Sequence, residues 1–318
     1  MEAAPRSPIV KPARSSSAGF AVAFAILILG LMAAFTLGRY PLTLAEIAHA
    51  LIARLTGQPS SLGATVDVVV WNVRAPRVAA AVLVGMGLAV AGAAFQGLFR
   101  NPLVSPDILG ASSGAALGAV LGIYVVSIQL LGFAGGLAAV AVVYLVSASF
   151  RVDDVVLTLV LMGIVVGSLL GAGIGLIKYL ADPYNQLPAM TFWLLGSLAG
   201  IAPGDLAVMA GPIALGTAAL LLLRWQFDAM SLPEDEARAL GVPTTALRIA
   251  VVLAATLMTS SAVAAAGVIG WVGLVVPHIA RFLVGPSFHR LLPASALLGG
   301  GFVLLVDTTA RSAASVEG

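Results

Sequence analysis

Few residues in this chain have the type and spacing that catalytic chemistry requires. It contains no cysteine, which excludes disulfides, thiolate nucleophiles and cysteine-ligated metal sites. Its three histidines, His49, His278 and His289, lie far apart and show no metal-ligand spacing. The lysines Lys11 and Lys178 lie in no phosphate-binding G-x-x-x-x-G-K-[ST] loop, so any ATP must be hydrolysed by another chain. We therefore expect a protein that is not an enzyme, with no metal or cofactor of its own.

The densest group of charged residues lies in FDAMSLPEDEARALGVPTTALR, residues 227–248. Ser231 followed three residues later by Glu234 fits a capping box, so we expect a helix to begin here. Gly241 is placed to end that helix in a left-handed cap, and Pro243 can begin another turn. The pattern predicts two short helices separated by a glycine, with an ordinary solvated loop as the alternative.

The elements around this loop belong to a membrane protein. Of 318 residues, 60% are hydrophobic and only 9% are charged, whereas a soluble domain carries about 25% charged residues. The net charge of +2 gives no reason to expect nucleic acid as a partner. The first apolar run, 20–37, is long enough for a transmembrane helix, and a cleaved signal peptide is the less favoured reading.

Nine apolar segments have the length of membrane spans, and a shorter apolar piece lies at 190–200. Backbone exposed to lipid must satisfy its own hydrogen bonds, so these segments should be helices. Continuous runs also argue against a barrel, whose strands alternate at every second residue. The sequence predicts an all-α polytopic bundle with spans over 20–37, 78–99, 110–128, 130–149, 155–180, 205–224, 248–266, 268–284 and 292–309.

The distribution of basic residues orients this bundle. With a cytoplasmic N-terminus, ten of the 16 Lys and Arg residues fall on the inner side, as the positive-inside rule favours. We therefore expect a basic cytoplasmic tail over 1–18 and one transmembrane domain over 19–318. The loop 227–248 then lies inside, while Arg74, Arg77 and Arg311 lie outside.

The spans offer no obvious site for a coupling ion. Ion-coupled transporters usually keep ionisable residues in mid-span. In this sequence the ionisable residues closest to the spans all lie near predicted span ends: Asp107, Asp154, Lys178, Asp205 and Asp307. This argues for energy supplied from outside the chain. A secondary transporter or channel remains the alternative, and transport that survives ATP depletion would favour it.

Five motifs together resemble one known family. They are RAPR (74–77), RNPLVSPDILGASSGA (100–115), WLLGSL (193–198), EARALGV (236–242) and GWVGLVVPHIAR (270–281). In this order, over about residues 20–311, they are similar to the permease subunits of ABC importers for iron-siderophore, haem and cobalamin.

The resemblance implies the assembly and its inner contacts. Permeases of this family have ten transmembrane helices and form homodimers in the bacterial inner membrane. They work with two ATP-binding subunits, which carry ATP and Mg, and with a periplasmic substrate-binding protein. The family's coupling helices correspond to about Ser231–Thr245, with Ser231, Glu234, Glu236, Ala237, Arg238, Ala239, Leu240 and Gly241 as the candidates for ATPase coupling.

The resemblance also assigns an outer contact and a pathway. Arg74, Arg77 and Arg311 match the arginines that dock the binding protein. The alternatives are snorkelling side chains or, for Arg311, a helical pair with Asp307. The family's transport pathway corresponds to residues 155–180 and 190–200 of this chain. Its candidate lining residues are Met162, Ser168, Gln186 and Trp193, with Tyr184 and Asn185 nearby.

The resemblance leaves the substrate class open among iron-siderophore, haem and cobalamin, with an oxyanion less favoured, and a mostly apolar lining without fixed charge would pass a bulky chelate without trapping it. The chain departs from the family at its end. After DTTARSAASVE (307–317) the family continues with a Pro-Gly turn and a tenth helix, whereas this sequence stops at Gly318. We expect a shortened chain, which could be a truncated, non-transporting membrane protein, and a working nine-helix variant is the alternative.

Overall fold

The computed structural model describes residues 16–38, 40–57, 63–124, 127–150 and 155–316, and every regular element within them is helical. The predicted tail 1–18 lies largely outside the described residues, as does Asp154; α1 already begins at Ser16. The elements are α1 (Ser16–Thr36), α2 (Leu44–Thr56), α3 (Ala64–Val68), the π-helical η1 (Val69–Arg74), α4 (Ala75–Leu98), the 3-10 turn η2 (Pro106–Leu109), α5 (Ala111–Gly122), α6 (Ile128–Ser149), α7 (Val155–Leu180), α8 (Gln186–Leu194), α9 (Pro203–Leu222), α10 (Arg224–Ala229), α11 (Glu234–Ala239), α12 (Thr244–Ala266), α13 (Val272–Val284) and α14 (Phe288–Val316).

The prediction of an all-helical membrane bundle is confirmed. Seven helices in the described chain are long and apolar enough to cross a bilayer, and α5 and α13 are shorter apolar helices. These nine helices correspond to the nine predicted spans. The second span begins much earlier than the predicted residue 78, because α3, η1 and α4 form one continuous helix over Ala64–Leu98.

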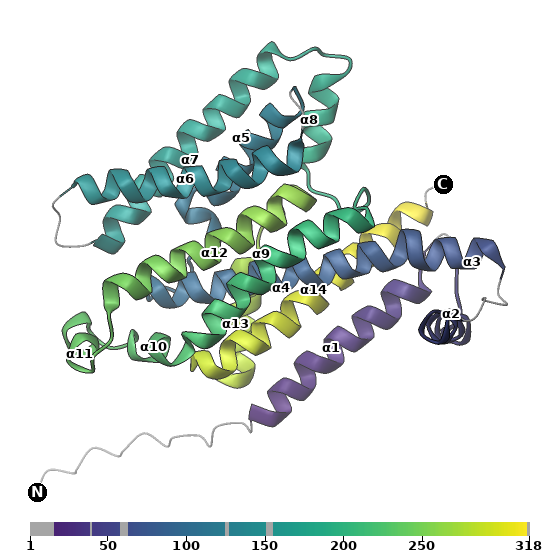
Figure 1. Cartoon of the computed structure of the whole chain (residues 1–318), viewed down its shortest axis with the longest axis horizontal. Coiled ribbons are helices and arrows are strands. Elements are labelled where there is room, and N and C mark those ends of the chain that lie inside the picture. The colour runs from purple at the N-terminus through teal and green to yellow at the C-terminus, as the bar shows by residue number, and fades with distance from the viewer. Residues whose placement is uncertain (1–15, 39, 58–62, 125–126, 151–154, 317–318) are drawn as a thin grey trace, which may run out of the picture.

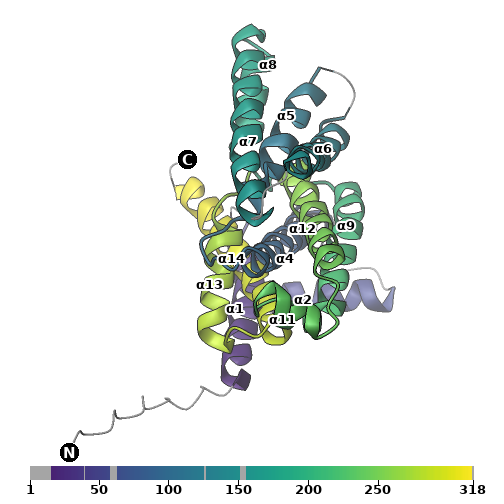
Figure 2. The same ribbon diagram turned by 90° about the vertical axis from the view of Figure 1, so that its left-hand side faces the viewer.

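Helix α4 lies at the centre of the bundle, with α1, α12, α13, α14 and α9 packed around it (Figures 1 and 2). Glycines make this packing possible. A Cβ at Gly85 would lie 2.1 Å from the carbonyl oxygen of Gly299 in α14, and one at Gly92 would lie 1.9 Å from that of Gly273 in α13. The helix backbones therefore touch at these crossings, as small residues allow in membranes.

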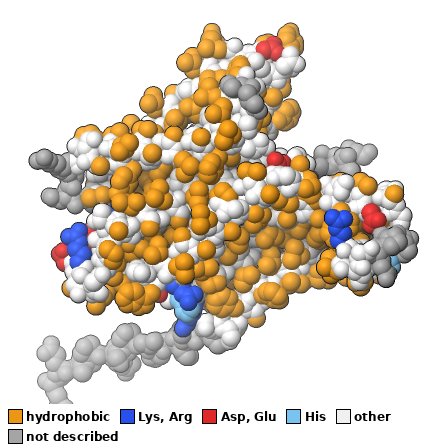
Figure 3. Space-filling model, viewed as in Figure 1, with side chains coloured by type: hydrophobic (Ala, Val, Ile, Leu, Met, Phe, Trp, Pro, Cys, Tyr) orange, Lys and Arg blue, Asp and Glu red, His pale blue; other side chains and the backbone are white. Residues whose placement is uncertain are grey.

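Helices α5, α6 and α7 form a second group, which packs on α12 and appears at the top of Figure 1. Helices α10 and α11 lie at the end of the bundle where α1 begins, and α2 and α3 lie at the opposite end (Figure 1). Figure 3 shows a largely hydrophobic face on which most charged side chains lie near the helix ends. This distribution is that of a protein surrounded by lipid along its middle.

Candidate functional site

The loop 227–248 contains one complete short helix, α11, whose C-terminal end is tightly defined, and it begins within the last residues of α10. Gly241 has a φ of +81°, the left-handed conformation predicted for it. Its N–H donates to the carbonyl of Arg238 at 2.9 Å, and the N–H of Val242 donates to that of Ala237 at 3.1 Å. This pair of bonds is a Schellman motif, and both Val242 and Ala237 are buried beneath it.

Two details of the predicted loop are wrong. Ser231 does not cap α11: its hydroxyl donates to the carbonyl of Asp228 at 2.7 Å, and Pro233 is the residue that precedes the helix. The second short helix is absent as well, because the residues after Gly241 enter α12 directly at Thr244. Pro243 does precede a helix, but that helix is a membrane span.

Glu234 fastens α11 to this span. Its carboxylate accepts hydrogen bonds from Arg238 at 2.6 Å and Thr244 at 3.1 Å, and it pairs with Arg248 at 3.3 Å. Partial burial raises the pKa of Glu234, but the Thr244 hydrogen bond and the two arginine charges outweigh it and lower the pKa. The carboxylate therefore stays ionised at neutral pH and holds α11 against the first turns of α12.

Two further contacts tie the same region to other helices. Arg100, which follows α4 and has a left-handed φ of 49°, donates to the carbonyl oxygens of Met230 and Leu232. Asp228 accepts a hydrogen bond from the N–H of Phe288 at the start of α14. Movement of the segment that carries α11 must therefore act on α4, α12 and α14 together.

The predicted coupling residues differ in their exposure to solvent. Glu236, Arg238, Ala239, Leu240 and Gly241 are exposed, with 59% of Leu240 accessible. Ser231 is exposed and Glu234 is partly so. Ala237 is fully buried in this chain, so it is not part of the exposed surface of α11. It faces inward because it closes the Schellman motif.

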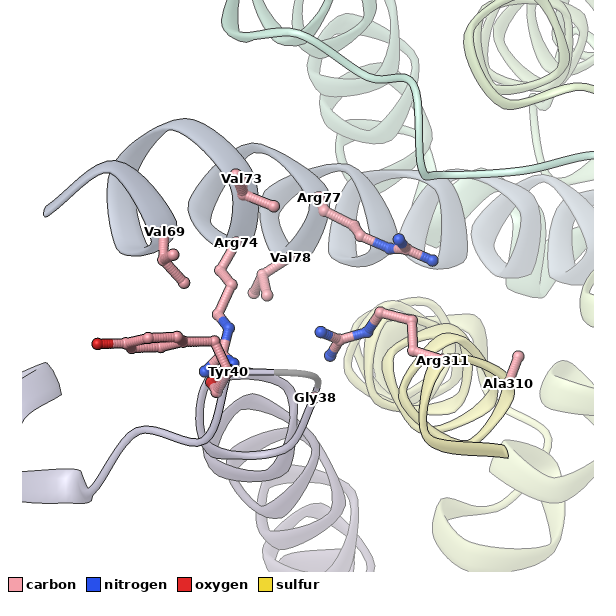
Figure 4. A pocket seen from close by; sticks show the side chains of 9 residues that line it. All are labelled: Gly38, Tyr40, Val69, Val73, Arg74, Arg77, Val78, Ala310 and Arg311. Atoms are coloured by element: carbon pink, nitrogen blue, oxygen red, sulfur yellow. Dashed lines mark hydrogen bonds between the residues drawn. The ribbon is translucent and has the colours of Figure 1, made fainter. Parts of the chain in front are cut away.

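At the opposite end of the bundle, the three predicted docking arginines come together around one cavity of about 520 Å³. Figure 4 shows Arg74 and Arg311 directed toward the turn at Gly38 and Tyr40 from two different helices. Arg77 makes a two-point pair with Asp307, with nitrogen to oxygen distances of 2.7 to 3.1 Å.

Asp307 lies well inside α14 and not near a helix end as predicted, since the helix continues to Val316. It is held by two arginines, because Arg311 also approaches it at 3.4 Å, the helical pair that was the alternative to docking. The carboxylate is thus paired and forms part of an ion cluster.

Arg74 and Arg311 also cap the C-terminal end of α1. Arg74 is buried and donates to the carbonyls of Phe35 and Tyr40. Arg311 donates to Ala34 at 3.0 Å and to Leu37 at 3.5 Å. The last carbonyls of a helix lack intrahelical partners and carry partial negative charge, so two guanidinium groups stabilise them. These arginines therefore have a structural task whether or not they also dock a partner.

The predicted pathway residues lie in different surroundings. Ser168 and Tyr184 are exposed, whereas Met162 packs partly against the core. Gln186 accepts a hydrogen bond from the Asp182 N–H at 3.1 Å, and Asn185 donates to the Asp182 carboxylate at 2.8 Å. Trp193 lines a cavity of about 230 Å³ between α8, α9 and α12. The structure therefore groups these residues along α7 and α8 but not around a single cavity.

One face of α7 is apolar and uncovered by the described chain. Leu161, Ile164, Val165, Leu169 and Leu176 are each about half exposed or more, although α7 is a candidate membrane span.

Helix α7 also contains a row of glycines at intervals of four residues, namely Gly163, Gly167, Gly171 and Gly175. A Cβ at Gly163 would meet η2 at 2.0 Å, whereas Gly171 and Gly175 have open space beside them. Gly163 and Gly167 therefore lie against other described parts of the chain, whereas Gly171 and Gly175 have no such neighbour among the described residues.

The sequence interpretation missed the roles of Asp228, Arg100 and Arg248. Arg100 and Arg248 were read only as inner-side positive charges, and Asp228 only as part of the loop. The motif containing Arg100 was a signal of importance, but no residue pattern indicated which partners these side chains would reach.

Known proteins share both the sequence and the fold. Residues 26–317 match the model of the FecCD transport family. The chain is 37% identical to the molybdate import permease MolB of Haemophilus influenzae, over 92% of this chain and 87% of that protein. It is 38% identical to the hemin transport permease HmuU of Yersinia pestis, over 76% of this chain and 75% of that protein.

The cobalamin import permease BtuC of Halobacterium salinarum is 38% identical, over 79% of this chain and 69% of that protein. A solved ABC transporter, described as of the metal-chelate type and inward-facing, superposes with a TM-score of 0.82 and 35% identity. The match covers 93% of this chain and 91% of that one. The chain therefore belongs to the FecCD transport family and is a membrane-spanning permease subunit of an ABC transporter.

Proposed function

We propose that this permease forms a homodimer in the bacterial inner membrane and imports a metal chelate of the iron-siderophore, haem or cobalamin class. Two ATP-binding subunits, which hold ATP and Mg, supply the energy from the cytoplasmic side. A periplasmic binding protein delivers the chelate. The transport domain occupies residues 19–318, and the tail 1–18 is cytoplasmic.

The observation that carries the homodimer is the half-used glycine row of α7. Close helix packing in membranes relies on small residues at intervals of four, and among the described residues none lies within 4 Å of a Cβ placed at Gly171 or Gly175. A second copy of α7 packed against this side would use them and would cover part of the exposed stripe, with the rest left along the pathway. The pathway would then run between the two copies, beside Met162, Ser168, Gln186 and Trp193.

The apolar character of the part of this face that would border the pathway supports the chelate class. Its large exposed side chains are Leu, Ile and Val, which suit a bulky, partly apolar cargo and offer no charge to trap it. Oxyanion import is the second candidate, because the molybdate permease MolB is 37% identical to this chain.

The two ends of the bundle supply the partner surfaces. The exposed residues of α11 would contact the ATP-binding subunit, and the Schellman motif would keep the helix rigid enough to transmit a push. Three arginines line the 520 Å³ cavity, and two of them, Arg77 and Arg311, pair with Asp307. The net positive charge would steer an acidic lobe of the binding protein to this site.

Two experiments test the proposal. The chain has no cysteine, so Gly171→Cys introduces a single thiol. We expect oxidation to give a disulfide-linked dimer in membranes, whereas Gly211→Cys, an open site on α9, should not. Dimer formation at Gly211 but not at Gly171 would contradict the α7 interface.

The second experiment measures transport. Proteoliposomes containing the permease and its ATP-binding subunit are supplied with the binding protein and each of four cargoes: ferric siderophore, haem, cobalamin and molybdate. ATP-dependent uptake of one chelate and not of molybdate is expected. Uptake of molybdate alone would replace the chelate by an oxyanion, and uptake without ATP would exclude the importer mechanism.

A further inference from the structure

We infer that α2 lies in the membrane surface at the end of the bundle opposite α10 and α11, with one apolar face inserted among the lipid acyl chains. This inference rests on the membrane-spanning bundle and does not depend on the transported substrate. The partner is thus a lipid bilayer, contacted by a helix outside the nine spans.

The direction of α2 is the first observation. It is seen end-on in Figure 1 and lengthwise in Figure 2, so it runs across the ends of the long helices and not along them. A helix of 13 residues is about 20 Å long, too short to cross a hydrocarbon core of about 30 Å. A helix of this length and direction can lie on a bilayer but cannot span it.

The position of α2 relative to the membrane surface is fixed by its attachment to α1. It follows α1 after a short turn, and the buried Arg74 donates to the carbonyl of Tyr40 within that turn. The same arginine also holds the last turn of α1 through Phe35. Because α1 is a membrane span, its end marks the edge of the hydrocarbon, and α2 is fastened at that level.

The distribution of side chains around α2 is the second observation. Ala50 and Ala53 are buried and Ile47 is partly buried, and this face packs toward Val66 and Val70 of the α3 and η1 segment. Helical spacing places Leu44, Ala48, Leu51, Ile52 and Leu55 together on the opposite face. The exposed fractions of Leu44, Leu51, Ile52 and Leu55 are 50%, 48%, 60% and 77%.

The residues that border this apolar stripe are those typical of a membrane surface. The guanidinium carbon of Arg54 lies 5.4 Å from the centre of the Trp71 ring, and Tyr40 is partly exposed in the turn before α2. Trp and Tyr are enriched at the level of lipid headgroups. Glu46 caps the first turn with Thr43, which keeps its carboxylate on the polar side.

The stripe is also continuous with surface that already faces lipid. Helix α1, which contacts α2, exposes Leu29 and Met32 in its second half, and Leu37 directly after it is exposed as well. A helix with one polar face and one strongly apolar face, held beside such a surface, inserts its apolar face by about 5 to 10 Å. The five stripe side chains carry no charge or hydrogen-bonding group to recognise a polar protein surface, which favours lipid over the binding protein.

Single cysteines on α2 test this placement, because the chain has none of its own. Leu51→Cys, Leu55→Cys and the control His49→Cys are each spin-labelled in the full-length permease, in bilayer discs of phosphatidylethanolamine and phosphatidylglycerol. His49 lies on the same helix and is exposed, but it points away from the stripe. Power saturation then compares collisions of each label with oxygen, which concentrates in lipid, and with a water-soluble nickel chelate.

We expect the oxygen-to-nickel ratio to be several-fold higher at Leu51 and Leu55 than at His49. Equal ratios at the three positions would overturn the inference. A rise at Leu51 and Leu55 that appears only after the binding protein is added would also overturn it, because the stripe would then be a protein contact. All three side chains are exposed, so the substitutions leave the packed core unchanged.

Discussion

The carboxylate of Asp228 in α10 caps the first turn of α14 from a different part of the chain. Its Oδ1 accepts a hydrogen bond from the N–H of Phe288 at 2.7 Å, and its Oδ2 accepts one from the hydroxyl of Ser287 at 3.0 Å. The neighbouring rings of Phe227 and Phe288 pack at 4.8 Å. The segment that carries α11 is thereby joined to the helix that carries Asp307 and Arg311.

Replacing Asp228 with Ala should lower the free energy of unfolding by about 1 to 2 kcal/mol, the cost of losing a helix cap. Asp228→Asn should cost less, because its amide oxygen can still accept one of the two bonds. Thermal unfolding in detergent measures both variants. Asp235→Asn, at an exposed carboxylate of α11, is the control, and an equal loss there would refute a specific role for Asp228.

A β-branched residue at Gly241 should uncouple ATP hydrolysis from uptake. At a φ of +81°, Val carries a steric cost of at least about 1 to 2 kcal/mol, so the Schellman motif should open and α11 should lose its rigid end. ATPase rate and uptake are measured together in proteoliposomes.

Gly57→Val is a matched control for this variant. Gly57 ends α2 with a φ of +68° and, like Gly241, has open space beside it, but it lies at the opposite end of the bundle. It should carry a similar steric cost and still transport. Loss of coupling in both variants would show that backbone strain in general, and not the position of Gly241, causes the effect.

Glu234 should make stability depend on pH in acid. Its pKa in the folded protein is lowered from 4.5, because the Thr244 hydrogen bond and the charges of Arg248 and Arg238 outweigh burial. A lowered folded pKa stabilises the fold above the unfolded pKa and loses that stabilisation as pH falls through the folded value. Glu234→Gln should therefore be less stable than the native chain at pH 7, with a difference that shrinks below pH 4.5.

Because the Glu234 side chain is 40% exposed, we expect a difference of only about 0.5 to 1 kcal/mol at neutral pH. Glu236→Gln in the same helix is the comparison, since none of the described residues forms an ion pair with Glu236. A pH-independent difference between Glu234→Gln and the native chain would show that the carboxylate charge contributes nothing.

Arg74→Ala should destabilise the bundle at every salt concentration. It removes two charge-assisted hydrogen bonds, one to the end of α1 and one to the turn that follows it, each of a kind that contributes about 1.5 to 3 kcal/mol, and burial shields them from salt. Arg54→Ala, which removes an exposed arginine from α2, should cost far less. If Arg74→Ala unfolds with native stability and only weakens binding of the binding protein, its role is docking and not capping.

The sequence predicted the nine spans and the class of fold because the backbone of a long apolar run in a membrane can satisfy its hydrogen bonds only as a helix. The left-handed Gly241 was also predictable, since few other residues adopt that conformation. Ser231 was misassigned because its hydroxyl had a closer acceptor in Asp228, and nothing in the local pattern separates the two outcomes.

The contacts between distant segments were beyond reach of the sequence alone. Arg74 matched a docking motif, yet it is buried against Phe35 and Tyr40, and only the packing of α1 beside α4 reveals this. Glu234 similarly pairs with Arg248 across a glycine and a proline. A single sequence contains the residue types of such pairs but not the helix crossings that bring them together.

The contact between Gly85 and Gly299 bears on how the chain assembles during synthesis. The continuous helix Ala64–Leu98, which ends in α4, emerges early, and 78% of its most apolar window is buried in the finished bundle, largely by helices made later. With a mean hydropathy of 2.2, that window is apolar enough to enter the bilayer alone. Gly85 therefore has no packing partner from α14 until that helix is translated, and the central crossing of the bundle is completed only late in synthesis.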